Sequence, residues 1–174
     1  MLYRDIKLRA LEPEDLELRY RWENDPSYWK GNDTIMPVSR YTLKRYIEES
    51  HNKSIYETKQ VRLMIDYTPD NVSVGALDIF DFDPYHLRAE IGILIADKKY
   101  RRRGIASMSL ECIINYCFKT LHLHQLYCNI RSDNSRSINL FCKLGFVHTG
   151  VKKEWAKTPS GYTDEYTFQL INRD

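Results

Sequence analysis

The segments Glu90-Ile-Gly-Ile-Leu-Ile95 and Tyr100-Arg-Arg-Arg-Gly-Ile-Ala-Ser107 decide how the rest of this sequence is interpreted. The first segment is an apolar run with the length of a buried strand. After the second segment, apolar residues recur at helical spacing as far as Leu121. The basic, glycine-containing turn therefore joins the end of a strand to the first turn of a helix.

A turn of this kind is typical of an anion site. The first N–H groups of a helix have no partner within the helix, and the helix dipole adds about half a positive charge there. Gly104 lets the backbone approach a phosphate closely, and Ala106 leaves room beside it. Arg101, Arg102 and Arg103 add charge and forked donors, although a solvated basic turn is the alternative interpretation. Neither G-x-G-x-x-G nor G-x-x-x-x-G-K-[ST] is present, so the turn alone does not identify the ligand.

Two motifs together identify a family resemblance. The run from Arg101 to Ala106 reads R-x-x-G-x-A and resembles the [Q/R]-x-x-G-x-[G/A] signature of the GNAT superfamily of acyl-CoA-dependent N-acetyltransferases. Downstream, Asn134-Ser-Arg-Ser-Ile-Asn-Leu-Phe-Cys-Lys-Leu-Gly-Phe146 resembles that family's N-x-x-[S/A]-x-x-[L/I]-[Y/F]-x-K-x-G-F segment. The order and spacing agree over nearly the whole chain, and the spermidine-type and ribosomal-protein N-terminal acetyltransferases are the branches it resembles most. The resemblance implies an α/β fold with a mixed, mostly antiparallel central sheet, in which a parallel pair of strands splays apart for coenzyme A between flanking helices.

Size and composition are those of one ordinary domain. The 174 residues are 43% hydrophobic, and we expect a single acetyltransferase domain over 1–174. A net charge of +2 argues against a general nucleic-acid binder. The cysteines, which have no zinc-site spacing, are expected to be mostly buried small apolar residues, and we expect no metal: they are Cys112, Cys117, Cys128 and Cys142. With no signal-peptide pattern and no long apolar run, we expect a cytoplasmic protein that does not enter a membrane.

Periodicity and turn residues give the expected order of elements, β-α-α-β-β-β-α-β-α-β-β. The strands are expected at residues 4–9, 60–67, 73–80, 90–95, 125–130, 147–155 and 162–171, and the helices at 12–22, 39–50, 104–120 and 134–144. The unit from 90 to 130 should form a right-handed parallel crossover between antiparallel hairpins. This order matches the architecture that the resemblance implies.

The resemblance also implies how acetyl-CoA, the expected cosubstrate, is held. The backbone of Ile93, Leu94 and Ile95 would contact the pantetheine arm, with one N–H polarising the thioester oxygen. The pyrophosphate would lie on backbone amides of the turn and of the first helical residues, and these are Arg102, Arg103, Gly104, Ile105, Ala106 and Ser107. Asn134 would contact the pantetheine or adenosine side, and it could equally cap the helix that follows it.

Glu90 is the candidate catalytic base. It begins an apolar strand, and apolar surroundings raise the pKa of a carboxyl toward the range useful for deprotonating an amine through water. The alternative is a strand-edge acid paired with Arg88 or a lysine. The resemblance identifies no general acid in this chain. Many family members carry a tyrosine that protonates the departing thiolate, and this chain has Phe141 at that position. Tyr162 and Tyr166 are the substitutes that the sequence offers.

The acceptor groove of the family lies between the first two helices, their loop and the last hairpin. That loop is rich in acids and aromatics, which suit a cationic amine, although Trp22 could belong to the core and the others to a solvated loop. The candidates for acceptor binding are Trp22, Glu23, Asp25, Tyr28 and Trp29, with Asn24 and Asp33 beside them. The expected function is acetyl transfer to a small-molecule amine such as a polyamine. A protein N-terminus as acceptor and a non-catalytic, CoA-binding protein are the alternatives, and a homo-oligomer is compatible with each.

Overall fold

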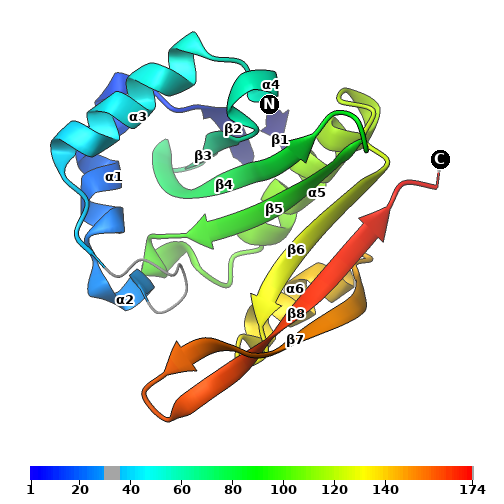
Figure 1. The fold of residues 1–174 in the computed structure, drawn as a ribbon. Helices are drawn as coiled ribbons and strands as arrows, with labels where there is room; N and C mark the ends of the chain where they lie inside the picture. The colour runs from blue at the N-terminus through cyan, green and yellow to red at the C-terminus, as the bar shows by residue number, and fades with distance from the viewer. Residues whose placement is uncertain (30–35, 174) are drawn as a thin grey trace.

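An eight-stranded sheet organises the computed structural model, which describes residues 1–29 and 36–173 (Figure 1). Its strand order is β1-β2-β3-β4-β5-β6-β8-β7. The strands are β1 (Leu2–Tyr3), β2 (Ile6–Ala10), β3 (Val61–Tyr67), β4 (Val72–Asp83), β5 (Arg88–Ile95), β6 (Gln125–Arg131), β7 (Val147–Thr158) and β8 (Gly161–Ile171). Every neighbouring pair is antiparallel except β5 and β6, so the mixed sheet with one parallel pair is confirmed.

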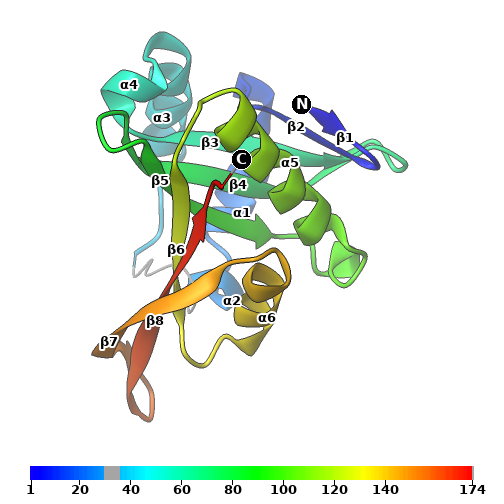
Figure 2. The ribbon, with the colours of Figure 1, turned by 90° about the vertical axis from the view of Figure 1, so that its right-hand side faces the viewer.

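Helices cover both faces of the sheet. They are α1 (Leu16–Glu23), α2 (Pro26–Trp29), α3 (Arg40–Asn52), α4 (Ile55–Thr58), α5 (Ile105–Lys119) and α6 (Ser135–Lys143), with single 3₁₀ turns at Pro13–Asp15 and Lys98–Tyr100. Figure 2 shows α1 and α3 on one face, with α5 and α6 on the other. No helix in these described ranges is long and apolar enough to cross a bilayer.

Alternation along the central strands divides the interior into two cores. Ala89 and Ile91 of β5 pack with Ile105 and Ile113 of α5 in the larger cluster. The smaller cluster lies under α1 and α3 and contains Leu11, Trp22, Ile47, Met64 and Ala96. Because side chains of a strand alternate between the faces, β5 supplies the large core and also presents its other side chains toward α1 and α3. Glu90, Gly92 and Leu94 of β5 lie on that second face.

Local signals explain where several elements begin. Ser39 caps α3 by accepting a hydrogen bond from the Thr42 N–H at 3.1 Å, and the helix begins next to it, within one residue of the predicted start. The sequence did not predict β1, α2 or α4, which have only two or four residues each. Helix α4 is held by a reciprocal capping box between Ser54 and Glu57. Elements this short carry too few residues to show a period.

Candidate active site

The parallel pair opens into a fork. Strands β5 and β6 pair only through Arg88, Ala89 and Glu90, although β5 continues to Ile95 and β6 to Arg131. Beyond Glu90 the two strands diverge, as Figure 1 shows. A cavity of about 1070 Å³ occupies this opening and extends over the α1–α3 face of β3 and β4. The predicted splaying of the parallel pair is therefore confirmed.

The turn before α5 has the backbone of an anion site. Gly104 has φ +78° and caps the helix, and a Cβ placed there would meet no atom within 4 Å. The first amide of this helix to bond one turn back is that of Met108, which donates to the Gly104 carbonyl at 3.0 Å. Helix geometry leaves the amides before it without a helical acceptor. Arg102 also has a positive φ, of 64°.

The three arginines do not form one patch. Arg101 turns back, and its Nε donates to the Ile95 carbonyl at 2.9 Å. The guanidinium of Arg103 lies 5.0 Å from the centre of the Tyr100 ring and 4.0 Å from a carboxylate oxygen of Asp70. The Tyr100 hydroxyl donates to Asp70 at 2.8 Å. Arg101 and Arg103 therefore hold the turn in place. Arg102 is exposed, as Arg103 is, and it makes no such contact with the described residues.

Two side chains of the first helical turn are also bound or packed within the protein. Ile105 is buried in the core, and the Ser107 hydroxyl donates to Glu111 at 3.2 Å. Glu111 in turn accepts from Tyr3 at 2.8 Å, which ties β1 to α5. Because these side chains have partners within the protein, the backbone amides are the groups of this turn that could bind a pyrophosphate. The sequence predicted the same groups for this role.

Glu90 lies at the point where the strands part. Its carboxylate accepts from the Asn129 side chain at 3.0 Å and from the Asn129 backbone N–H at 3.3 Å. Burial raises the pKa of Glu90, against the opposing effect of these hydrogen bonds, and the nearby Asp81 raises the pKa further. Arg88 pairs with Asp83 at 3.4 Å, so the pairing of Glu90 with Arg88 is not what the structure shows.

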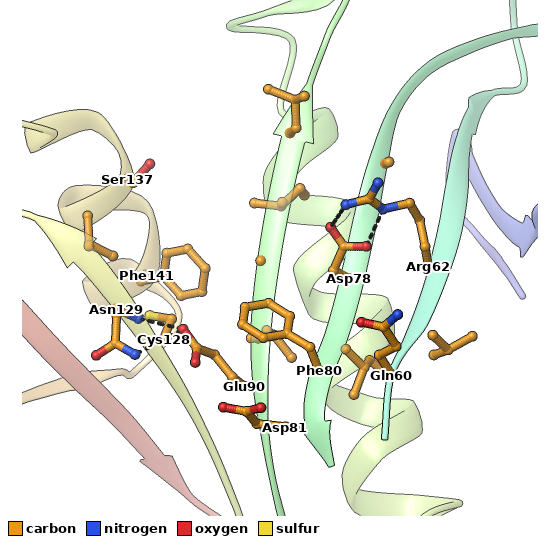
Figure 3. Close-up of a pocket in the computed structure, with 18 of the residues that line it drawn as sticks. Gln60, Arg62, Asp78, Phe80, Asp81, Glu90, Cys128, Asn129, Ser137 and Phe141 are labelled. Atoms are coloured by element: carbon orange, nitrogen blue, oxygen red, sulfur yellow. Dashed lines mark hydrogen bonds and ion pairs between the residues drawn. The ribbon is translucent and has the colours of Figure 1, made fainter. Parts of the chain in front are cut away.

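Asp81 is an acid that the sequence did not single out. Phe80 pairs with Glu90 and Asp83 with Arg88, so two residues of β4 stand opposite Ala89 alone. This is a β-bulge, and it returns Phe82 to the core while Asp81 lines the cavity with φ +49°. The carboxylates of Asp81 and Glu90 face one another in Figure 3. The Tyr127 hydroxyl donates to Asp81 at 3.3 Å, and burial raises the pKa of Tyr127 to about 12.

Charged side chains form the far wall of the cavity, over β3 and β4. Arg62 makes two hydrogen bonds to Asp78, at 2.5 and 2.8 Å, and one to Glu23 at 3.0 Å. Glu23 also pairs with Arg19, whose side chain is 3% exposed. Tyr46 of α3 lines this wall, and burial raises its pKa. Sequence reasoning missed this set apart from Glu23, because its members come from four elements.

The predicted acceptor loop is only partly at the cavity. Glu23 lines it, whereas Trp22 packs into the smaller core, which was the alternative interpretation of that residue. Asp25 accepts from the Ser27 N–H at 2.8 Å and is not among the lining residues. The side chains of Tyr28 and Trp29, and all of Asp33, lie outside the described residues.

Helix α6 forms the wall on the β6 side. Asn134 caps it by accepting from the Ser137 N–H at 3.2 Å, and it also lines the cavity. Phe141 lines the cavity as well, is 3% exposed, and packs edge-to-face on Phe146. The two substitute tyrosines are elsewhere: Tyr162 is 64% exposed near the tip of the β7–β8 hairpin, and Tyr166 packs against His148.

The cavity offers several carboxylates and the thiol of Cys128. Within the described ranges, no group of three or more histidine, cysteine, aspartate or glutamate side chains could hold a metal ion. Cys128 is buried in the cavity wall, and Cys112 and Cys117 are buried in α5. Cys142 is exposed, so the expected burial of the cysteines holds for the other three.

A sheet opened at a parallel pair, a helix N-terminus beside the opening and a half-buried carboxylate within it are features of an acyl-transfer enzyme of the thioester-using type. The comparisons agree: residues 5–147 match the model of the acetyltransferase (GNAT) domain, and the chain belongs to this family. It is an N-acetyltransferase.

Three known proteins are similar. Spermidine N(1)-acetyltransferase of Escherichia coli is 27% identical over 148 residues, which are 83% of this chain and 74% of that protein. An N-acetyltransferase 9-like protein of Nematostella vectensis is 38% identical over 133 residues, which are 74% of this chain and 67% of that protein. Spermidine N-acetyltransferase of Vibrio cholerae, solved with CoA and spermine, has a TM-score of 0.84 at 24% identity and matches 97% of this chain and 96% of its own. Another structure of the Vibrio protein is dodecameric.

Proposed function

We propose that this protein moves the acetyl group of acetyl-CoA to a primary amine of a small cationic molecule such as a polyamine. The observation that carries the proposal is the carboxylate pair of Glu90 and Asp81, which faces the opening between β5 and β6. Two carboxylates attract an ammonium group and leave a base beside the nitrogen that must lose its proton. The Escherichia coli and Vibrio cholerae relatives named for spermidine support this acceptor class.

Acetyl-CoA would be held mainly by main-chain groups. The amides from Arg102 to Ser107 would bind the pyrophosphate at the start of α5, where the helix dipole favours an anion. The backbone of Ile93, Leu94 and Ile95 lies on the strand edge that β6 leaves, and Ile93 and Leu94 line the cavity. These groups suit the pantetheine arm. Placing both reactants in one cavity supplies much of the rate, by up to roughly 7–11 kcal/mol in well-oriented systems.

Glu90 would accept the proton of the bound ammonium, directly or through water. The free amine nitrogen then bonds to the thioester carbon, the carbon–sulfur bond breaks, and the nitrogen releases its second proton to water as the amide forms. Asn129 holds the carboxylate of Glu90 in place through two hydrogen bonds. Because burial raises the pKa of this carboxyl, it is a better proton acceptor than an exposed glutamate.

The departing thiolate has no tyrosine beside it on α6. Among the described residues that line the cavity, Tyr46 is the only tyrosine, and it lies on the far wall with Arg62 and Asp78. A thiol has a pKa near 8.5, so the thiolate can leave near neutral pH and take its proton from water. Phe141 would then serve as an apolar wall.

The experiment is a thermal shift followed by an amine panel. At about 100 times its dissociation constant, acetyl-CoA should stabilise the fold by about 2.7 kcal/mol. Release of free thiol is then measured with monoamines, diamines, spermidine and a peptide with a free N-terminus. Turnover with the small amines supports the proposal, turnover with the peptide alone supports the N-terminal alternative, and binding without any turnover supports the non-catalytic one. Absence of any shift would overturn the acetyl-CoA site.

The chain is also expected to form a homo-oligomer, as the Vibrio relative does. The exposed apolar side chains of the last hairpin suit a contact between copies, and they include Val147, Val151 and Trp155 of β7. Light scattering measures this directly, and a monomeric mass at micromolar concentration would contradict it.

A further inference from the structure

Arg62, which lines the cavity, is held by hydrogen bonds to two acids of the cavity wall. Its Nε and Nη2 bond Asp78 at 2.5 and 2.8 Å, and its Nη1 bonds Glu23 at 3.0 Å. Asp78 faces the guanidinium with both oxygens, as Figure 3 shows. The positive charge that Asp78 attracts is therefore already supplied by the protein.

Asp78 lies within reach of a substrate held at Glu90. Asp78 pairs with Gly92, whereas Glu90 pairs with Phe80, so the two acids are on neighbouring strands and two residues apart. Strand spacing and rise put their Cα atoms about 8 Å apart. Both line the same cavity, and the Phe80 ring lies over Gly92 between them, with its Cε1 3.3 Å from the position that a Cβ of Gly92 would take, so a substrate chain that joins the two acids would run along this ring. A chain of a few methylenes would span this distance.

The two acids differ in charge balance. Glu90 accepts from Asn129 and Asp81 accepts from Tyr127, and no ion pair joins Glu90 or Asp81 to a cation in the described ranges. Lys152, the cation whose charge acts on Glu90, is itself paired with Glu165 at 2.9 Å. Asp78 is neutralised by Arg62. One end of the cavity can therefore attract an ammonium group, and the other end cannot.

We propose that Arg62 determines acceptor specificity as a built-in cation, which takes the position that a second ammonium group of a polyamine would occupy on Asp78. This inference rests on the proposed function, because it assumes that the reacting amine lies at Glu90. The protein then recognises only the charge near the reacting nitrogen. A monoamine and a polyamine with the same reacting end should have kcat/KM values within a few-fold of each other.

The test is the Arg62→Gln variant with 1-aminobutane, 1,4-diaminobutane and spermidine. Without the guanidinium, Asp78 is left as an unpaired acid that can bind a second ammonium. A charge-assisted hydrogen bond of that kind should raise the preference for the diamine or for spermidine over the monoamine by about 10- to 100-fold. Spermidine should also raise the melting temperature of Arg62→Gln more than that of the wild type.

Two matched variants control for the loss of a buried side chain. Arg62→Lys keeps a cation and should keep the wild-type preference. The double variant Arg62→Gln with Asp78→Asn removes both charges and should return the preference to that of the wild type. An Arg62→Gln protein that is folded, binds acetyl-CoA and shows an unchanged preference overturns the role of Arg62.

Asp78→Asn tests the same idea from the other side, and decides it if Arg62→Gln does not fold. This change removes one acid partner from Arg62 and should reduce kcat/KM for spermidine more than for 1-aminobutane. An equal reduction for both amines would overturn the inference. If the wild type acetylates no amine at all, the proposed function fails and Arg62 loses its role with it. Normal wild-type turnover with unchanged selectivity in the variants defeats only the role of Arg62.

Discussion

The two ends of the cavity are built in different ways. At the proposed cofactor end, one continuous segment from β5 to α5 would supply the main-chain groups, and Gly104 and Ala106 are the residues whose type is expected to matter. At the acceptor end, side chains from α1, α3, β3, β4 and β5 meet on one face of the sheet. A site of the first kind appears in the sequence as a motif, because spacing along the chain sets its geometry. The second kind depends on strand register, which no local motif records.

Loss of the base should have the largest effect on the acceptor end. Glu90→Gln removes the proton acceptor while keeping the shape, and we expect kcat/KM to fall about 10²- to 10⁴-fold at neutral pH. Acetyl-CoA affinity, set at the other end, should change little. The measurement is steady-state thiol release, with the exposed Glu48→Gln of α3 as control.

The pH dependence follows from the same residue. Because burial raises the pKa of Glu90, the wild-type kcat/KM should fall as the pH drops through that raised pKa, where the carboxyl is protonated and accepts no proton. In Glu90→Gln the rate should instead increase steadily toward high pH, where the amine loses its proton unaided. The same pH profile in both proteins would give Glu90 a structural role.

A single methyl group should have the next largest effect, at the cofactor end. In Gly104→Ala a Cβ enters the open space where the pyrophosphate would lie, and φ +78° is unfavourable for alanine. If the affinity falls tenfold, an acetyl-CoA concentration that stabilises the wild type by about 2.7 kcal/mol stabilises the variant by only about 1.4 kcal/mol. Melting curves with and without acetyl-CoA measure both values.

Gly161→Ala is the matched control for that change. Gly161 also has a positive φ, of 127°, and open space around the position of a Cβ, but it is the first residue of β8, at the tip of the last hairpin. The Gly161→Ala variant should be less stable than the wild type, but acetyl-CoA should raise its melting temperature by the same amount. An equal loss of that shift in both variants would show that the effect at Gly104 is backbone strain rather than contact with the cofactor.

Phe141→Tyr addresses the boundary between the two ends. It adds one hydroxyl to a side chain that lines the cavity, and we expect kcat to increase by about tenfold if protonation of the thiolate limits the rate. The KM for acetyl-CoA should be unchanged. A constant kcat would mean that water already supplies the proton, and a large increase in KM would mean that Phe141 packs tightly against the cofactor.

The smallest effect is expected from the hydrogen bond between Tyr100 and Asp70, which holds the turn before α5. Tyr100→Phe removes the hydrogen bond to Asp70, and should lower the free energy of unfolding by about 0.5–1.5 kcal/mol. Urea denaturation measures this, and the KM for acetyl-CoA should increase only slightly because the amides of the turn remain. Tyr116→Phe on α5 is a control of the same type. A large increase in KM would show that side chains contribute more to the cofactor end than the contrast between the two ends implies.

The sequence alone determined the order of the long elements, the parallel crossover, the anion-binding turn and the candidate base. Each of these depends on neighbours in the chain: alternation along a strand, helical spacing, or a glycine before an amphipathic helix. Gly104 and Glu90 occupy the places predicted for them because one strand–turn–helix unit contains both. The roles predicted for them in catalysis and binding await the experiments above.

Tertiary structure alone decided which charged side chains share the acceptor end. Asp81 reaches the cavity because of a β-bulge. Strict alternation would put it on the other face of the sheet from Phe80 and Glu90. Arg62 and Asp78 are 16 residues apart and meet because β3 and β4 pair in one register. A shift of one strand by one residue would put the two side chains on opposite faces of the sheet. Strand pairing is set by packing of the whole core, so the acceptor end could not be assembled from residue order.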